Sequence, residues 1–563
     1  MTLKMSRMVT FGKNTVHYCL YTAKTTERCL MLHTVLPVAA ISSAATQQAI
    51  AMIIYFVAMI MIGVWAYTRT NTIDDYMLGG RELNPLVAAL SAGAADMSGW
   101  LLMGLPGALY LTGLIEGWIA IGLTIGQWIN WKVVAPRLRS YTEVAGNSIT
   151  VPSFLSMRVR DDRHIISIVA GIIFVVFFTI YVGSGLVSGG KFFNEAFGMD
   201  YALGMTLVAG IVVIYTLIGG FLAVSWTDMI QGLMMLIALL AVPIMGLVAV
   251  GGFGEVTSAV SEVNPGFLNM FSSEDGTGAA IISIISNLAW GLGYFGMPHI
   301  IVRFMALKTP QQAKSARRIG MSWMIFSALG AVATAVVGVA MNKQGLISVD
   351  DPEKVFLSMG SALFHPFFAG FVLAAVLAAI MSTISSQLLV TSSAVVEDIY
   401  TAVSDKKMKD STGINMGRAV ILIVTLVGAL IALDAGRENP IVGDSILNLV
   451  SFAWAGFGAA FGPTIILALY WRKLSSTGAV SGMTVGAVSA VLWHYAFNNG
   501  DASWIVGTGL YEILPAFILN LLVTWLVSRA TYKPNADIEA EFDAAVAMTN
   551  AENYTPATQT EKA

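Results

Sequence analysis

The sequence predicts an all-α integral membrane protein, and three observations support this fold class. Of the 563 residues, 56% are hydrophobic and only 12% are charged, whereas soluble proteins carry roughly 25% charged residues. The mean hydropathy is +0.73. The apolar residues also gather in segments of about 20, the length that an α-helix needs to cross a bilayer. This composition excludes a soluble enzyme, and a net charge of −3 provides no basic surface for nucleic acid.

About thirteen apolar segments are long enough to span a bilayer as helices. In chain order they cover residues 50–68, 87–111, 115–134, 164–190, 203–222, 229–250, 279–304, 321–341, 366–392, 418–434, 446–470, 477–496 and 511–530. The chain therefore divides into an N-terminal extension (1–46), a membrane domain (47–532) and a tail (533–563). The tail is polar and rich in Ala, Thr and Glu, so we expect it to be solvated.

The distribution of Lys and Arg predicts the orientation of these helices. Loops after the odd-numbered segments carry nineteen of the 31 basic residues, and the loops on the other side carry four. Cytoplasmic loops of membrane proteins carry an excess of Lys and Arg. We therefore expect the odd-numbered loops and the C-terminal tail in the cytoplasm, and the N-terminus outside.

The N-terminal extension does not follow this rule. It places five basic residues and both cysteines on the expected outer side: Lys4, Arg7, Lys13, Lys24, Arg28, Cys19 and Cys29. A weak signal peptide would explain basic residues followed by an apolar stretch, and an upstream-misread start codon would explain them without any function. Because the membrane domain has no cysteine, it holds no disulfide, thiolate metal site or cysteine nucleophile.

Segments two and seven are predicted to be interrupted. Residues 91–100 read SAGAADMSGW, and residues 290–298 read WGLGYFGMP. Gly and Pro free backbone carbonyls from the helical ladder, so these carbonyls can face an ion or a substrate. Close packing of small residues would explain either stretch alone. However, five helices separate the two starts, as an inverted repeat of five plus five helices requires, and discontinuous helices in corresponding positions are typical of transporter sites.

Asp96 lies near the middle of segment two, where a charged side chain costs roughly 3 kcal/mol to insert. An ionisable group at that depth is functional by default. Asp96 could coordinate a cation, carry a proton or orient nearby backbone, and a purely structural role is the alternative. Ser98 adds a hydroxyl two residues later.

Segment nine supplies candidate ligands for an alkali cation. Ala379, Ser382 and Thr383 are spaced i, i+3, i+4, so one carbonyl and two hydroxyls can point the same way. Hard cations favour oxygen ligands, and uncharged oxygens suit an ion that must also leave. The alternative is that both hydroxyls bond back to their own helix.

Four aromatic residues in segments two, four and seven are candidates for the wall of a small-ligand pocket: Trp100, Tyr181, Trp290 and Tyr294. Packing or anchoring at the membrane interface is the alternative. Arg81, in a cytoplasmic loop, is either an orientation signal or a gate. No His spacing suggests a metal site. The sequence also has no nucleotide-binding loop or nucleophile–base set, which argues against an enzyme.

Several long strings indicate a family. They are TNTIDDYMLGGREL (70–83), SAGAADMSGWLLMGLPGA (91–108), IGGFLAVSWTD (218–228), WGLGYFGMPHI (290–300), AAIMSTISSQLLV (378–390) and FAWAGFGAAFGP (452–463). In order and spacing, over about residues 48–530, the chain resembles the sodium/solute symporter family.

The resemblance implies a LeuT-type fold of thirteen helices, with the first helix outside the inverted repeat. It also implies a multi-pass protein of the bacterial plasma membrane that couples downhill sodium entry to uptake of L-proline by alternating access. Sodium would be the coupling ion, and no cofactor is implied. The implied partners are therefore the sodium ion, L-proline and the lipid bilayer, without nucleic acid.

The resemblance also assigns roles by position. The implied sodium ligands are the carbonyls of Ala94, Met97 and Ala379 and the hydroxyls of Ser382 and Thr383. Asp96 and Ser98 match residues important for sodium coupling, while Arg81 and Asp228 match loop residues implicated in coupling and conformational change. The residues that match the lining or gate of the proline pocket are Trp100, Tyr181, Trp290, Tyr294 and Pro298.

One departure from the pattern bears on the substrate. Met297 stands before Pro298, where the matching pattern carries Gln, so the polarity near the pocket differs. Fold does not determine substrate. A symporter of the same fold for another small solute is therefore the nearest alternative, and a membrane sensor or a passive channel is an alternative of a different class.

Overall fold

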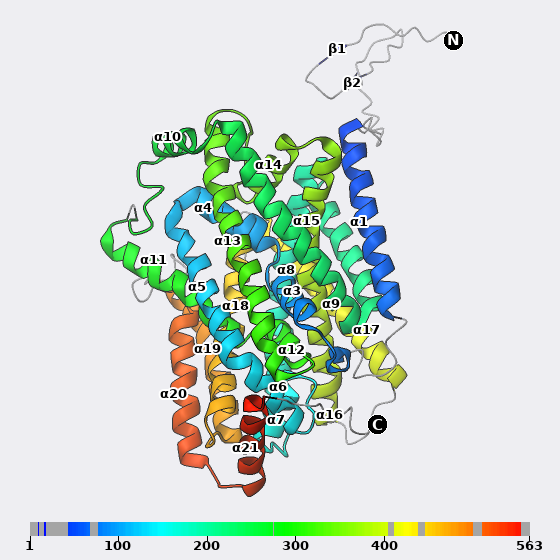
Figure 1. Ribbon diagram of the computed structural model, residues 1–563, viewed down its shortest axis with the longest axis vertical. Helices are drawn as coiled ribbons and strands as arrows, with labels where there is room; N and C mark the ends of the chain where they lie inside the picture. Colours follow the sequence, from blue (N-terminus) through cyan, green and yellow to red (C-terminus); the bar gives the residue numbers. More distant parts are fainter. Residues whose placement is uncertain are drawn as a thin grey trace, which may run out of the picture. The chain divides into compact units, whose positions relative to one another are not determined.

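The computed structural model describes residues 9–10, 16–17, 43–67, 77–273, 275–403, 410–436, 445–498 and 509–552, and their regular structure is almost entirely helical (Figure 1). The exception is the antiparallel pair β1 (Val9–Thr10) and β2 (Val16–His17), within the unit Met1–Thr46. Most of the predicted extension, including Cys19 and Cys29, lies outside the described residues. A second compact unit begins at Gln47 and contains the helical bundle.

The helices and the short 3₁₀ or π turns between them, labelled η, succeed one another along the chain. The first are α1 (Ser43–Tyr67), η1 (Gly79–Arg81), α3 (Pro85–Asp96), η2 (Trp100–Gly104), α4 (Leu105–Thr112), η3 (Leu114–Glu116), α5 (Gly117–Ile129), η4 (Asn130–Val134), α6 (Ala135–Val144), α7 (Val151–Val159), α8 (Ile165–Phe197), α9 (Tyr201–Val250) and α10 (Phe253–Val263). Next come α11 (Thr277–Ala289), η5 (Trp290–Phe295), α12 (Pro298–Met305), η6 (Pro310–Gln312), α13 (Ala313–Lys343), η7 (Pro352–Lys354), α14 (Val355–Leu363), α15 (Pro366–Ser393), η8 (Ala394–Ile399), α16 (Tyr400–Val403), α17 (Asp410–Ala435), α18 (Ile446–Tyr470), α19 (Ser476–Trp493), η9 (His494–Asn498), α20 (Ile513–Thr531) and α21 (Ala536–Asn550).

Within the described residues, 10 helices are long and apolar enough to cross a membrane, or 11 if the bent pair Pro85–Asp96 and Trp100–Thr112 forms one span. Two predicted segments are helical but are not among them. Segment 115–134 forms α5 and η4, and segment 203–222 begins α9, whose first apolar run Tyr201–Leu217 is shorter. A total of thirteen spanning helices therefore stays a prediction.

The predicted interruption of segment two is confirmed at Met97. α3 begins after Asn84, whose side-chain oxygen accepts from the amides of Leu86 and Val87. It ends at Asp96, because Met97 leaves the helical region (φ −88°, ψ 84°). The chain then resumes a helical path bent by 61° from α3.

The predicted interruption of segment seven is confirmed as well. α11 passes into the tighter 3₁₀ segment η5, and Met297 is extended (φ −81°, ψ 105°) before Pro298 starts α12. Proline disfavours helical backbone in the residue before it, and it has no N–H to continue the ladder. The position of Pro298 therefore explains where the helix breaks.

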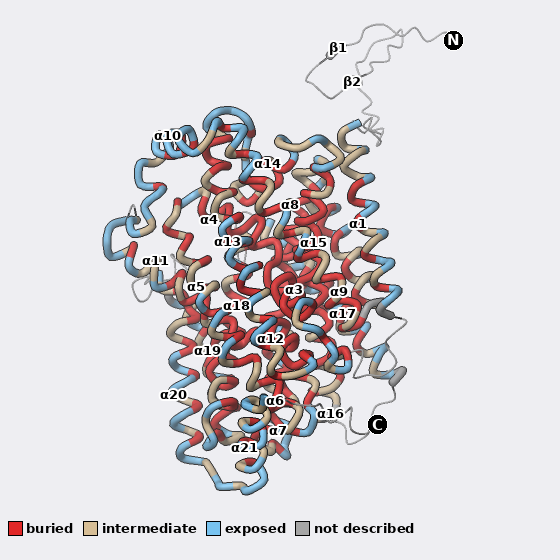
Figure 2. Tube along the Cα trace, in the orientation of Figure 1, coloured by how far each residue is buried: buried red, intermediate tan, exposed pale blue. Residues whose placement is uncertain are grey.

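Both interruptions lie deep in the bundle. α3 packs against α9, α12, α13 and α15, while η5 packs against α5 and α18. Most of α15 and α18 is buried, whereas most of α1, α17, α19 and α20 is not (Figure 2). The exposed side chains of these outer helices are largely apolar, as a lipid-facing surface requires.

The expected solvated tail differs from the structure over Ala536–Asn550, which forms α21. Ile538, Phe542 and Ala545 are buried, and their i, i+4, i+7 spacing places them on one face of the helix. The Phe542 ring packs edge-on against Tyr141 of α6, with ring centroids 6.0 Å apart. The overall composition of residues 533–563 does not register the spacing of these three residues, so it did not predict the helix.

Candidate functional site

The Ala94 carbonyl joins the interrupted helix to α15. In a continuous helix it would accept from the amide of Ser98, but that amide donates to the Asp96 carbonyl (3.1 Å). The freed Ala94 carbonyl accepts from the hydroxyls of Ser382 (2.7 Å) and Thr383 (3.4 Å). All three residues are buried. The structure thus brings together three of the five implied sodium ligands.

The other two implied ligands flank this contact. The Ser382 hydroxyl also contacts the Ala379 carbonyl of its own helix (3.1 Å), so back-bonding and the cross-helix bond coexist. Met97 comes three residues after Ala94 and is fully buried. The Leu101 amide donates to the Ser98 carbonyl (3.1 Å) and does not continue the ladder to Met97. The carbonyls of Ala94 and Met97, at the break in segment two, are therefore both released from the helical ladder inside the protein.

Asp96 connects segment two with the aromatic residues. One carboxylate oxygen, Oδ2, accepts from the Tyr294 hydroxyl (2.5 Å). The Asp96 backbone carbonyl accepts from the Trp100 indole (3.1 Å) and the Tyr181 hydroxyl (3.4 Å). The second carboxylate oxygen, Oδ1, is buried without a partner among the described residues. Residues predicted separately, from different stretches of sequence, meet at this aspartate.

An aromatic cluster extends from Asp96 toward α18. The ring of Trp290 lies 6.3 Å from that of Trp100, 6.4 Å from that of Trp454 and 5.3 Å from that of Tyr511, measured between centroids. All four rings are buried. Trp454 and Tyr511 were not predicted as site residues, although Trp454 lies in the FAWAGFG string that carried the family resemblance.

The contacts of the Ser98 and Pro298 side chains are with residues other than the implied sodium ligands. The Ser98 hydroxyl accepts from the amide of Trp100 (3.4 Å), the first residue of η2. Pro298 lines a separate cavity together with Phe174, Phe221 and Ser393. Trp100, Tyr181, Trp290 and Tyr294 are not among the residues that line this cavity.

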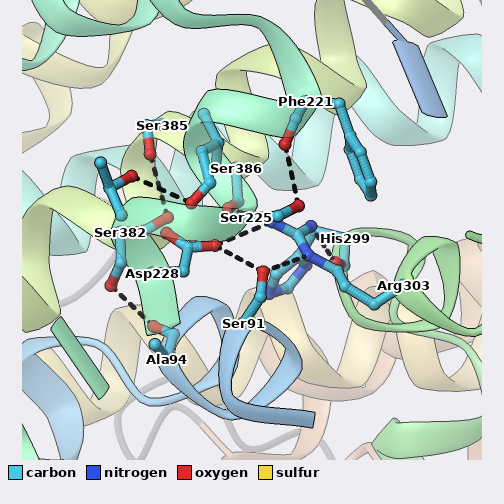
Figure 3. A network of polar contacts seen from close by, with 12 residues as sticks. Ser91, Ala94, Phe221, Ser225, Asp228, His299, Arg303, Ser382, Ser385 and Ser386 are labelled. Atoms are coloured by element: carbon cyan, nitrogen blue, oxygen red, sulfur yellow. Dashed lines mark hydrogen bonds and ion pairs between the residues drawn. The ribbon is translucent and has the colours of Figure 1, made fainter. Parts of the chain in front are cut away.

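Asp228 forms a buried polar network with Arg303 (Figure 3). Its Oδ2 atom accepts from the Ser91 hydroxyl (2.8 Å) and from Arg303 Nη2 (3.1 Å). The same guanidinium donates to Ser91 Oγ (3.1 Å) and Ser386 Oγ (2.7 Å), and to the His299 carbonyl. The network joins α3, α9, α12 and α15 next to the contact between Ala94 and Ser382.

Two expectations about this network are wrong. The resemblance implied that Asp228 is a loop residue, but it lies inside α9 and is fully buried. Arg303 is one of the nineteen basic residues that were assigned to loops after the odd-numbered segments, but it lies inside α12 and is 1% exposed. An arginine within a predicted apolar span was the available signal, because such a charge is normally paired in the interior.

Arg81 lies apart from the oxygen ligands and ties other segments together. Its guanidinium donates to the Thr142 hydroxyl (3.0 Å), the Asn147 side chain (3.0 Å), and the carbonyls of Ser148 (2.8 Å) and Met305 (3.0 Å). It thereby links η1 with the α6–α7 connection and the end of α12. The role of Arg81, as an orientation signal or as a gate, stays a prediction.

An ion-pair cluster links three elements at the end of α8. Lys191 Nζ lies 2.6 Å from Glu353 Oε2 and 2.8 Å from Asp351 Oδ2. Glu353 Oε1 accepts from the Ile446 amide (2.8 Å) at the start of α18. Burial raises the pKa of the Glu353 carboxyl, and the neighbouring Lys191 opposes this shift. Lys191 is one of the four basic residues that were assigned to loops on the expected outer side, and the sequence predicted no further role for it.

The site around Ala94 suits a small, hard cation. It offers uncharged carbonyl and hydroxyl oxygens, with one carboxylate close by, and such oxygens are the ligands that hard cations favour. No group of three His, Cys, Asp or Glu side chains that could hold a metal ion occurs in the described part of the chain. The neighbouring aromatic rings supply an apolar wall for a small organic solute.

Comparisons with known sequences identify the relatives of this chain. The "High-affinity proline transporter PutP" and the "Osmoregulated proline transporter OpuE" of Bacillus subtilis (strain 168) are each 50% identical to it. The alignments cover 86% and 85% of this chain and 98% and 94% of the relatives. A "Sodium/proline symporter" of Staphylococcus aureus is 48% identical over 88% of this chain and 95% of its own length.

A structural comparison shows the same fold in a solved protein. The substrate-bound outward-open structure of a Na⁺-coupled sialic acid symporter superimposes with a TM-score of 0.70, covering 87% of this chain and 98% of that chain at 19% identity. The protein therefore has the LeuT-type transporter fold that the resemblance implied. Its relatives are transporters of a symporter family and not enzymes.

A family model covers most of the membrane domain. The model described as "Sodium:solute symporter family" matches residues 76–486, which include both interrupted helices, the Asp228 network and α15. Together with the identity of about half to full-length relatives, this match shows the family. The chain therefore belongs to the sodium:solute symporter family, whose coupling ion is sodium.

Proposed function

We propose that this protein is a sodium-coupled symporter that accumulates L-proline across the bacterial plasma membrane by alternating access. The observation that carries the proposal is the freed Ala94 carbonyl, which faces the hydroxyls of Ser382 and Thr383 beside the buried carboxylate of Asp96. The names of relatives that are 48–50% identical support proline as the solute.

The sodium ion would bind between the interruption of segment two and α15. Its ligands would be the carbonyls of Ala94, Met97 and Ala379 and the hydroxyls of Ser382 and Thr383. When the ion binds, it replaces the hydrogen bonds that the Ser382 and Thr383 hydroxyls donate to the Ala94 carbonyl. The two hydroxyl hydrogens would then turn toward carbonyls of their own helix. Ser382 already has such an acceptor in the Ala379 carbonyl (3.1 Å). Asp96 adds a negative charge nearby.

Proline would bind beside the aromatic cluster. Its apolar ring suits the rings of Trp100, Trp290 and Tyr294, and its carboxylate suits backbone amides freed at an interrupted helix. Tyr181 and Pro298 would line or gate the same path. Because fold does not determine substrate, uptake has to be measured with competing solutes.

Coupling would pass through Asp96. The carboxylate lies on the segment that carries Ala94 and Met97, and it accepts from Tyr294 on η5 (2.5 Å). A shift of segment two on sodium binding would therefore move the Asp96 carboxylate, which Tyr294 of the proline pocket contacts. Thermodynamic linkage then requires proline to tighten sodium binding as much as sodium tightens proline binding. Ser98, Asp228 and Arg81 would support the conformational change.

The expected orientation places the N-terminus outside and the C-terminus in the cytoplasm. It can be tested with single cysteines in a variant that lacks Cys19 and Cys29, because the membrane domain has none. Ala544→Cys on α21 should react with a membrane-impermeant maleimide only after the cells are permeabilised. Ser272→Cys should react in intact cells. The opposite pattern would contradict the orientation.

The decisive experiment is uptake of labelled proline into proteoliposomes. Proline should accumulate above its external concentration when an inward sodium gradient is present, and it should only equilibrate when choline replaces sodium. Failure to accumulate proline would overturn the proposed substrate. Accumulation of a competing solute instead would identify the same-fold alternative suggested by Met297, while gradient-independent equilibration would indicate a channel.

A further inference from the structure

The 3₁₀ segment η5 is held by two side chains that belong to other elements. The Trp454 indole N–H of α18 donates to the Trp290 carbonyl (2.8 Å), which starts η5. The Asn130 amide, at the junction of α5 and η4, donates to the Tyr294 carbonyl (2.9 Å) near its end. Trp454 is 1% exposed and Asn130 is 0% exposed.

Interrupted helices leave carbonyls that need partners inside a membrane protein. A buried carbonyl without a hydrogen bond costs free energy, and neighbouring side chains are the usual remedy where a spanning helix is broken. Asn130 supplies that remedy for the Tyr294 carbonyl, because Pro298, four residues later, has no N–H to donate. Trp454 adds a donor to the Trp290 carbonyl, at the other end of η5. The position of η5 is therefore determined by α18 and by the α5–η4 junction, in addition to its own backbone bonds.

Close packing limits how η5 can move. A Cβ atom on Gly293 would clash with the Trp454 indole, and a Cβ on Gly291 would clash with the Gly122 carbonyl of α5. The Trp454 ring also stands edge-on to the Tyr294 ring, with centroids 5.2 Å apart and planes at 88°. The same indole therefore fixes the η5 backbone and orients the ring that reaches Asp96.

The hydrogen bonds from Trp454 and Asn130 both bear on the position of the Tyr294 side chain. Tyr294 lies between them and donates its hydroxyl to Asp96 Oδ2 (2.5 Å). Asp96 in turn lies between Ala94 and Met97, which carry implied sodium ligands. Neither Trp454 nor Asn130 contacts Ala94, Ser382 or Thr383 through a hydrogen bond in the described structure.

We propose that Trp454 and Asn130 are positioning residues that set the sodium dependence of transport by holding the Tyr294 hydroxyl on Asp96. This inference rests on the proposed function. Loss of either donor lets η5 shift, weakens the bond to Asp96 and loosens the segment that carries the sodium ligands. The concentration of sodium that gives half-maximal uptake should then rise more than the KM for proline at saturating sodium.

The test uses Trp454→Phe and Asn130→Leu, which remove the donors and keep similar shapes. Matched controls are Trp118→Phe and Asn194→Leu, because Trp118 donates to the Met270 carbonyl (2.8 Å) and Asn194 of α8 donates to the Met199 carbonyl (2.9 Å), and neither bond involves η5. We expect the half-maximal sodium concentration to rise about three- to tenfold in the two test variants, the size that loss of one buried hydrogen bond gives. The controls should change it less than twofold.

A double-mutant comparison separates positioning from general damage. If Trp454 and Asn130 act through Tyr294, either substitution should have little further effect on the sodium dependence of a Tyr294→Phe variant. Additive effects would show that they act independently of Tyr294, and an unchanged sodium dependence in both single variants would overturn the inference. If both single variants fail to fold while the controls fold, the Trp454 and Asn130 hydrogen bonds serve the stability of the fold. That result would also overturn the inference.

The sodium response of the purified protein distinguishes this inference from the proposed function. The thermal unfolding midpoint should rise with sodium in the wild type without any proline, and higher sodium should be needed for the same rise in Trp454→Phe. If the wild type responds to sodium but does not accumulate proline, the proposed substrate fails while the positioning role stands. If wild type and Trp454→Phe respond equally to sodium, the positioning role fails while the proposed function stands.

Discussion

The carbonyl of Ala94 shows how one displaced hydrogen bond creates a candidate ion ligand. The Ser98 amide donates to Asp96 and not to Ala94, and two hydroxyls from α15 use the vacated acceptor. The i, i+3, i+4 spacing of Ala379, Ser382 and Thr383 was readable from the sequence. Their partner was not, because a contact between positions 94 and 383 depends on how two distant helices pack.

Thr383→Ala should weaken the response to sodium. Its hydroxyl points at the Ala94 carbonyl (3.4 Å) and not at its own helix, so its loss removes a proposed ligand. We expect the half-maximal sodium concentration for proline uptake to rise about tenfold, a change of roughly 1.4 kcal/mol. Thr391→Ala is the control, because the Thr391 hydroxyl bonds back to the Gln387 carbonyl of α15 (2.7 Å). Normal sodium dependence in Thr383→Ala would remove this residue from the site.

Breaking the Asp228–Arg303 pair should destabilise the protein strongly. Removal of one partner leaves an uncompensated buried charge, which costs about 3–5 kcal/mol. Arg303→Gln and Asp228→Asn should each lower the thermal unfolding midpoint in detergent. The double variant should lose less than the sum of the two, because neither charge remains unpaired. Additive losses would show that the two side chains stabilise the fold separately.

At the level of elements, the two interruptions differ in their local cause, since only segment seven contains a proline at the break. Pro298 explains the break after η5, and the small residues of segment two let α3 approach its neighbours closely. Both breaks were predicted because Gly and Pro act locally on the backbone. The bend of 61° in segment two and the 3₁₀ form of η5 were not predictable, because packing against α5, α15 and α18 decides them.

Gly126→Ala should displace η5 from α5. A Cβ at this position would clash with the backbone of Gly291, and backbone cannot move aside as a flexible side chain can. We expect a lower unfolding midpoint and a marked loss of proline uptake per folded molecule, since the substitution disturbs the segment that carries Trp290 and Tyr294. Gly63→Ala is the control, because a Cβ there meets nothing within 4 Å. Equal behaviour of the two variants would contradict the proposed close packing as a functional constraint.

At the level of the membrane unit, side chains near both ends of the spanning helices join segments that are distant in sequence. Lys191, Glu353 and Ile446 connect α8, η7 and α18, while Arg81 connects η1, the α6–α7 connection and α12. α21 adds a further connection, through an ion pair between Arg160 and Glu541 (2.5 Å) and through Phe542. An alternating-access cycle must rearrange some of these contacts.

Phe542→Ala should lower stability much more than loss of a surface charge on the same helix. The ring is buried against Tyr141 and lies under the guanidinium groups of Arg158 and Arg472, 5.5 and 5.0 Å from its centroid. Truncation of a buried Phe costs about 3–5 kcal/mol, whereas the exposed Arg472–Asp543 pair contributes about 0–1 kcal/mol. Thermal unfolding of Phe542→Ala and Asp543→Asn should therefore differ clearly. Similar midpoints would show that α21 contributes little to the folded state.

The sequence by itself determined the membrane class, the positions of the apolar helices, both interruptions and the candidate oxygen ligands on segment nine. These features are local, because hydropathy, Gly, Pro and helical spacing act within a few turns of one helix. Only the tertiary structure decided that Asp96 meets Tyr294, that Arg303 neutralises Asp228 in the interior, and that Trp454 and Asn130 hold η5. Each of these contacts joins residues more than 70 positions apart, and a buried polar group is satisfied by whichever partner packing brings to it.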